Sequence, residues 1–215
     1  MPGFPLPLRN GLAALAIAAL EDDDATAALG WLAAAGGALP EGAGARLAML
    51  HLIDPGRSEL LAVHAPHAAG VSAHATRALA ARAAYSTLRH PGAAPVARAV
   101  RQAVALWNAA LFFEVHEVLE AVWKTATGET RQALQGVIQV AVAYHHLAHA
   151  NPRGARSLMA EGRVRLASVT ATILEPLDLT ALLAGTAPWA GVRAGDPAPE
   201  TPPSPLVLRA EAPGH

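Results

Sequence analysis

The sequence contains no cysteine among its 215 residues. This absence excludes a disulfide framework, a thiolate zinc site, an iron–sulfur cluster and a cysteine nucleophile. The sequence also lacks a run of basic residues, and its formal net charge is -1 at pH 7. Binding to nucleic acid without sequence preference needs clustered Lys and Arg to neutralise phosphates. We therefore predict no nucleic-acid partner.

Long apolar runs are missing as well. The longest early run, Gly11–Leu20, has about half of the roughly 20 residues that a membrane-spanning helix needs, and four acidic residues follow it at once. Arg9 before the run and the small-x-small form of Ala16–Ala18 resemble a signal peptide, but cleavage there would divide the apolar segment. We therefore predict a cytoplasmic protein with no membrane partner.

Apolar residues recur at helical spacing along almost the whole chain, and no segment alternates with a period of two over more than a few residues. The sequence therefore predicts an all-α helical bundle. We expect Asp24 to cap the second helix and Asn151 to cap the eighth, and the sixth helix to bend near Asn108. The predicted helices cover residues 8–20, 24–35, 42–52, 58–68, 71–89, 96–126, 129–150, 152–174 and 178–184.

The predicted organisation has three parts. Residues 1–95 form an Ala-rich helical region without a clear chemical motif, here called the N-terminal region. Residues 96–185 form a helical core. Residues 186–215 are rich in Gly, Pro and Glu, and we predict a disordered tail because this composition buries too little apolar surface. The N-terminal region contains histidines that we interpret as solvated or capping side chains: His64, His67 and His74.

Polar side chains that carry chemistry concentrate between residues 106 and 155. In one helix of this segment, helical spacing gives a stripe of Phe112, His116, Glu120 and Trp123. In the next helix, the same spacing gives a line of Gln135, Gln139, Val142 and His146. That second helix is apolar nearly all round, and a buried amide left unpaired costs about 1–3 kcal/mol. Its polar line must therefore face partners rather than water.

A short link makes these two helices antiparallel neighbours. Side chains lean toward the N-terminus of their own helix, so His116 and His146 are expected at the same level. Glu120 and Gln139 lie within one turn of that level. The sequence therefore predicts one small polar pocket between the two helices, with Glu114 and Glu117 at its rim.

Imidazole and carboxylate are suitable ligands for zinc, iron or manganese, and three protein ligands leave positions open for water or substrate. We predict that a divalent metal such as zinc or manganese binds at His116, Glu120 and His146, and a hydrolase is one activity that such a site would support. The side chains expected to contact a small polar ligand are Glu117, Trp123, Gln135, Gln139 and Asn151.

A second interpretation stays open. The same residues can form a buried hydrogen-bond network that only fixes the register of the helices. The protein would then be a non-catalytic structural or protein-interaction bundle. Homo-oligomerisation is compatible with either interpretation.

Two motifs link this segment to a known family. Asn108–Trp123 follows the pattern Phe-Asn-x-x-x-Phe-Phe-Glu-x-His-Glu-x-x-Glu-x-x-Trp, apart from Trp107 in place of the first Phe. A Leu-Gln-Gly-x-x-Gln run follows, then His-Leu and Asn-x-x-Gly-Ala, and its matching positions are Gln135, Gly136, Gln139, His146, Asn151, Gly154 and Ala155. Through these motifs, residues 100–175 resemble the domain of unknown function 309 family of small prokaryotic helical proteins.

The chain also departs from the family pattern at two further positions. Ala150 stands where a glycine commonly precedes Asn151, and His145 is an additional histidine. The resemblance implies a helical fold and a polar site, but it implies no particular biochemical activity.

Overall fold

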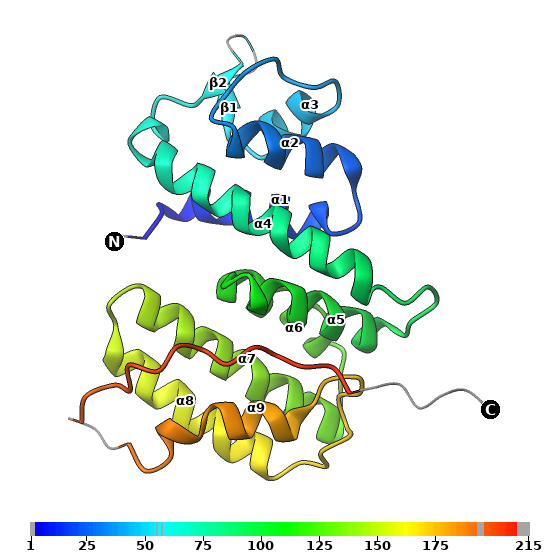
Figure 1. The fold of residues 1–215 in the computed structure, drawn as a ribbon, viewed down its shortest axis with the longest axis vertical. Helices are drawn as coiled ribbons and strands as arrows, with labels where there is room; N and C mark the ends of the chain where they lie inside the picture. The colour runs from blue at the N-terminus through cyan, green and yellow to red at the C-terminus, as the bar shows by residue number, and fades with distance from the viewer. Residues whose placement is uncertain (1–2, 55, 57, 193–195, 210–215) are drawn as a thin grey trace.

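The computed structural model describes residues 3–54, 56, 58–192 and 196–209. Almost all of its regular structure is helical, as the apolar spacing predicts (Figure 1). The elements are α1 Leu6–Ala19, α2 Asp23–Ala33, α3 Ala43–Met49, β1 Ile53–Asp54, β2 Glu59–Leu60, η1 Ala65–His67, α4 Ala68–Leu88, α5 Pro95–Asn108, α6 Phe112–Trp123, α7 Gly128–Ala148, α8 Pro152–Ala167, α9 Leu179–Gly185 and η2 Ala187–Trp189.

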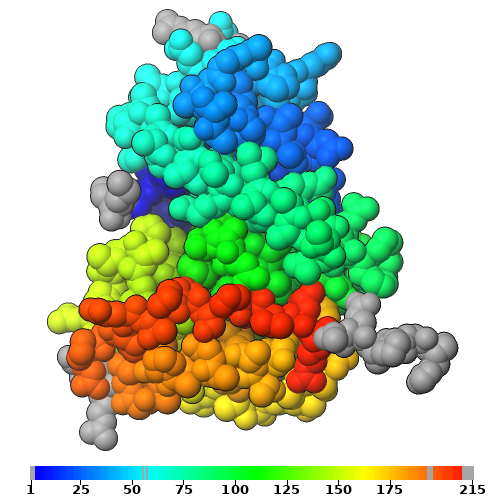
Figure 2. Space-filling model, viewed as in Figure 1, coloured from blue at the N-terminus to red at the C-terminus, as the bar shows by residue number. Residues whose placement is uncertain are grey.

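The N-terminal region packs directly on the helical core. Figure 1 shows α1 to α4 stacked above α5 to α9, and the two layers meet where α1 contacts α6 and α4 contacts α5. Figure 2 shows that the two layers are in contact on the face of the molecule that is drawn. Buried apolar side chains from both layers form one continuous cluster, which includes Leu12, Tyr85, Leu106 and Val140. No helix in the described part of the chain is long and apolar enough to cross a membrane.

Two helix predictions for the N-terminal region were wrong, and so was the interpretation of His64 and His74 as solvated or capping side chains, because both are buried. Residues 58–68 do not form one α-helix, because Asp54 Oδ1 accepts a hydrogen bond from Gly56 N and turns the chain into the small hairpin of β1 and β2. Only the end of this range is helical, in η1 and at the first residue of α4. Asp22, not Asp24, caps α2. Its Oδ1 accepts a hydrogen bond from Ala25 N at 2.9 Å, and its other oxygen binds Arg46. A run of neighbouring aspartates offers several possible caps, and contact with Arg46 favours the first of these three.

The helix predicted over 96–126 is two helices that separate at the predicted bend. Ala110 has a left-handed backbone with φ of 56°, and Leu111 N donates to Leu106 O at 2.9 Å. This is the Schellman arrangement that ends a helix. The chain therefore changes direction after α5, and α6 starts at Phe112 beneath α1. The helix predicted over 152–174 also ends early, at Ala167, because Thr170 N bonds to the Glu129 side chain instead.

Residues 196–209 are ordered against the core, although their composition predicts disorder. Asn108 holds this segment through two hydrogen bonds to Leu206, one to its carbonyl oxygen at 3.1 Å and one from its amide at 2.8 Å. Trp107 Nε1 donates to Ser204 O, and Leu208 pairs with Leu177. The amide of an asparagine side chain offers both a donor and an acceptor, so it can hydrogen-bond an extended backbone as a neighbouring strand would. The average composition of the segment does not reveal such a contact. Residues 193–195 and 210–215 of the predicted tail lie outside the described part.

Candidate functional site

The polar line of α7 faces α8, not α6 as the sequence predicts. Gln139 is buried, and its Nε2 donates to Glu161 at 2.8 Å while its Oε1 accepts from Arg165 at 3.0 Å. Both partners lie on α8. A Cβ added at Gly136 would meet Leu166 of α8 at 2.8 Å, so the glycine permits the close approach of the two helices. Gln135 is half-buried one turn before Gln139.

His146 does not join His116 and Glu120. The Asn151 side chain donates to His146 Nδ1 at 3.0 Å and also accepts from Gly154 N, which caps α8 as predicted. His146 therefore lies at the turn between α7 and α8. It is His145 whose ring faces α6, at 5.7 Å from the Phe113 ring. One residue of difference rotates a side chain by about 100° around a helix. The predicted metal set of His116, Glu120 and His146 is therefore not brought together.

On α6, the structure brings His116 and Glu120 together with Glu117. The three side chains offer donor atoms that all lie within 4.8 Å of one another, and His116 Nδ1 is 3.1 Å from Glu117 Oε1. All three side chains are half-buried. Trp123, further along α6, stacks under the Arg131 guanidinium at 3.8 Å, and its buried Nε1 has no partner among the described residues.

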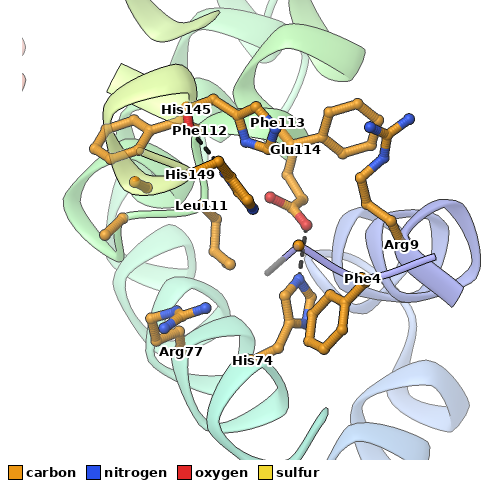
Figure 3. Close-up of a pocket in the computed structure, with 13 residues that line it drawn as sticks. Phe4, Arg9, His74, Arg77, Leu111, Phe112, Phe113, Glu114, His145 and His149 are labelled. Atoms are coloured by element: carbon orange, nitrogen blue, oxygen red, sulfur yellow. Dashed lines mark hydrogen bonds and ion pairs between the residues drawn. The ribbon is translucent and has the colours of Figure 1, made fainter. Parts of the chain in front are cut away.

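A cavity of about 300 Å³ lies between the N-terminal region and the helical core (Figure 3). It is bounded by α1, α4, α6 and the end of α7. Its polar lining comes from Arg9, His74, Arg77, Glu114, His145 and His149, and its apolar lining from Phe4, Leu111, Phe112 and Phe113. Of these polar residues, the sequence analysis assigned only Glu114 to a candidate site, and it expected Glu114 at the rim of a different pocket.

The base of this cavity is a buried hydrogen-bonded pair of side chains. His74 Nε2 on α4 donates to Glu114 Oε1 on α6 at 2.7 Å, and the two residues are 5% and 4% exposed. Figure 3 shows the Glu114 carboxylate lying between His74 and His149. His74 Nδ1 is buried without a hydrogen-bond partner in the described part of the chain. Because both groups are withdrawn from water, the pair rather than solvent must satisfy them.

Two arginines supply positive charge at the cavity. The Arg9 guanidinium lies over the Phe113 ring at 4.1 Å and bonds Asn10, but it makes no ion pair with a described carboxylate. Arg77 is exposed one turn after His74, and within the described residues its side chain has neither an ion pair nor a hydrogen bond. The cavity therefore has one carboxylate, already paired, and two arginines free of acidic partners.

The two histidines at the end of α7 complete the wall. His149 Nδ1 donates to His145 O at 2.8 Å, and the two rings are 4.2 Å apart. Burial is the main cause that lowers the pKa of His145 to about 4, and the nearby His149 and Arg9 lower it further. His145 is therefore neutral at pH 7. The contribution of Arg9 shows that its charge acts on this side of the cavity.

A family match confirms the resemblance seen in the sequence. Residues 100–158 match the sequence model of the family described as Domain of unknown function (DUF309). We call this matched segment the DUF309 domain. It includes α6 and α7 with most of α5 and part of α8, so it supplies Glu114, His145 and His149 to the cavity. Arg9, His74 and Arg77 lie outside it. No curated protein and no solved structure matches the chain.

Proposed function

We propose that the protein binds a small molecule with an anionic group, a carboxylate or a phosphate, in the cavity between the N-terminal region and the DUF309 domain. The observation that carries this proposal is the unpaired Arg77 at the mouth of a cavity whose base is the buried pair of His74 and Glu114. An arginine held beside a low-dielectric wall without a counter-ion attracts anions, and its planar donors suit carboxylate and phosphate.

The charge balance favours an anionic ligand over a cationic one. Arg9 and Arg77 contribute two fixed positive charges, against the single carboxylate of Glu114, which His74 already binds. A cation would have to displace His74 from a buried hydrogen bond, whereas an anion needs no such change. Positive charge that is focused in a cleft also raises the local concentration of anions.

Size and the remaining lining narrow the ligand class. A volume of about 300 Å³ is at the low end of small-molecule sites, so a small metabolite fits better than a nucleotide cofactor. Phe4 and Leu111 give it apolar walls. The Glu114 carboxylate faces the cavity and can accept a hydrogen bond from a hydroxyl or amine of the ligand (Figure 3).

The polar residues shared by α7 and α8 have a different role in this account. Gln139 is fully engaged with Glu161 and Arg165, and Asn151 with His146 and Gly154 N. We assign these groups to the junction between the two helices rather than to ligand binding. For location we keep the cytoplasm as a proposal. This proposal is supported by Ala16, which lies inside α1 and is completely buried in the core. Cleavage at Ala16–Ala18, the segment that resembles a signal-peptide site, would divide this buried helix.

The test is a titration of the full chain with inorganic phosphate and, separately, acetate, followed by isothermal calorimetry or by the thermal midpoint. Arg77→Gln removes the unpaired cation at an exposed position. Losing one charge-assisted hydrogen bond of about 1.5–3 kcal/mol corresponds to roughly ten- to hundredfold weaker binding. The matched control is Arg153→Gln, which removes an exposed arginine on α8, away from the cavity.

The proposal predicts saturable binding to the wild type and to Arg153→Gln, and a large loss for Arg77→Gln. Equal affinities in all three proteins, or no saturable binding of either anion, would contradict it.

A further inference from the structure

A groove of about 370 Å³, separate from the cavity, lies between α1, α5 and α6. It combines apolar walls with charged side chains of both signs. Ala99 and Val118 are buried lining residues, and Ile17 and Val122 are half-buried lining residues. The polar lining consists of Glu21, Arg98, Gln102 and Glu117.

Helical spacing explains why these side chains share one groove. Residues four positions apart lie on the same face of a helix. This spacing relates Arg98 to Gln102 on α5, and Val118 to Val122 on α6. The two faces meet where α6 also packs against α1, and Glu21 follows directly after the end of α1.

Glu21 is held in position by two neighbours. Tyr85 on α4 is 1% exposed, and its hydroxyl donates to Glu21 Oε1 at 2.7 Å. Gln102 Nε2 donates to the same oxygen at 3.5 Å. Burial, followed by this hydrogen bond to Glu21, raises the pKa of Tyr85 to about 12, so the hydroxyl stays a donor at neutral pH. Glu21 Oε2 has no partner among the described residues and is free to accept a hydrogen bond from a ligand.

Arg98 supplies the opposite charge. Its side chain is exposed, and within the described part of the chain it makes neither an ion pair nor a hydrogen bond. Arg98 lowers the pKa of Tyr85 whereas Glu21 raises it, so both charges act at the same hydroxyl. A carboxylate and a guanidinium therefore lie near each other in one groove without pairing.

These charges disfavour a simple ion. Glu21 and Glu117 place two carboxylates in the groove against the single arginine Arg98, which is the reverse of the balance in the cavity. An anion is therefore opposed by the carboxylates, and a cation leaves the arginine without a partner. A molecule that carries both charges satisfies both groups, since guanidinium suits a carboxylate and a carboxylate accepts from an ammonium group.

We propose that this groove binds an α-amino acid with an aliphatic side chain. Arg98 binds its carboxylate, Glu21 Oε2 accepts a hydrogen bond from its ammonium group, and Val118 and Val122 contact its side chain. The volume of about 370 Å³ is near the low end of small-molecule sites, which suits a ligand of this size. The proposal does not depend on anion binding in the cavity, so either can fail without the other.

The experiment measures the affinity of the full chain for L-leucine by calorimetry and compares it with three analogues. Isocaproate lacks the amino group, isoamylamine lacks the carboxylate, and glycine lacks the aliphatic side chain. In parallel, L-leucine is added to isotope-labelled wild-type protein, and the shifts of the backbone amide resonances are mapped on the chain.

Two variants each remove one charge at an exposed position of the groove: Arg98→Gln and Glu21→Gln. The matched control is Arg153→Gln, which removes an exposed arginine on α8, away from the groove. Arg77→Gln reports whether L-leucine enters the cavity instead. Because the two substituted groove residues are exposed, these variants should keep the wild-type circular dichroism spectrum.

Arg98→Gln and Glu21→Gln should each bind L-leucine at least about tenfold more weakly, because each loses a charge-assisted hydrogen bond. Arg153→Gln should bind it as the wild type does. The wild type should bind each analogue at least about tenfold more weakly than L-leucine, and the amide shifts should centre on residues 95–102 and 117–122.

Four results would each overturn the proposal. The first is the absence of saturable L-leucine binding to the wild type. The second is wild-type affinity in both groove variants, or loss of binding in Arg77→Gln alone. The third is equal affinity for L-leucine and for the analogues. The fourth is a set of amide shifts that centres on another part of the chain.

Discussion

The DUF309 domain and the N-terminal region contribute different kinds of residue to the cavity. The DUF309 domain has the long motifs, yet Asn108, Gln139 and Asn151 all make bonds that hold its own helices or the C-terminal segment in place. The N-terminal region has no clear motif, yet it supplies Arg77 and the partner of Glu114. The comparison teaches that a recognisable motif can mark the residues that build a fold, while the charge that selects a ligand comes from another region.

The largest expected effect tests whether the N-terminal region stabilises the DUF309 domain. His74→Ala leaves the Glu114 carboxylate buried without its partner, and breaking a buried pair in this way costs about 3–5 kcal/mol. Urea denaturation measures the loss, with His90→Ala as the control at an exposed position. A loss below about 1 kcal/mol would mean that the pair is worth no more than a surface ion pair.

The next prediction tests whether the polar side of α7 contacts α8 or α6. Gln139→Ala leaves Glu161 and Arg165 without their buried partner, at a cost of about 1–3 kcal/mol in unfolding free energy. In a double-mutant cycle, Gln139→Ala and Arg165→Ala should be coupled, whereas Gln139→Ala and His116→Ala should add to within about 0.5 kcal/mol. Coupling between His116 and Gln139 would instead support the pocket that the sequence predicts between α6 and α7.

A smaller effect concerns Ala150, one of the positions where the chain departs from the family pattern. Ala150 has φ of 55°, a left-handed backbone that costs a non-glycine residue about 1–2 kcal/mol, and Asn151 N donates to His146 O across this turn. Ala150→Gly should therefore raise the unfolding free energy by about 1 kcal/mol. The same change at Ala160, an exposed position inside α8, should lower it by about 0.5–1 kcal/mol. Destabilisation by both changes would contradict this explanation.

The smallest effect is the pH dependence caused by His145. Its pKa is lowered to about 4 in the folded protein, whereas the unfolded chain has the ordinary value near 6.5. Between these values the unfolded state binds more protons, so this contribution is complete above about pH 6.5 and is lost as pH falls toward 4. The ring is half-exposed, so we expect less than about 1 kcal/mol after screening by solvent. His145→Gln should flatten the stability profile in that window, and an unchanged profile would contradict the assignment.

Sequence reasoning succeeded where the determining interactions are local. Helical periodicity gave the fold class, and the Asn151 cap depends on residues only three positions apart. The break after Asn108 was anticipated as a bend. Its full extent depends on the left-handed Ala110, which no residue preference at that position indicates.

The candidate site could not be predicted because its contacts are distant in sequence. His74 and Glu114 are 40 positions apart, and periodicity does not say which N-terminal helix packs beside α6. The sequence predicted that His146 faces α6, whereas His145 does, and the reason for this error is related. Because α7 is apolar nearly all round, its sequence does not show which of its faces meets α6 and which meets α8.

The most direct test of the central claim is the pKa of His145, measured by nuclear magnetic resonance with and without saturating phosphate. An anion bound between Arg9 and Arg77 would offset the positive charge beside this ring and favour its protonated form. The account predicts that phosphate raises the pKa of His145 from about 4 toward its ordinary value in the wild type but not in Arg77→Gln. The same pKa with and without phosphate in the wild type would contradict the claim that this cavity binds small anions.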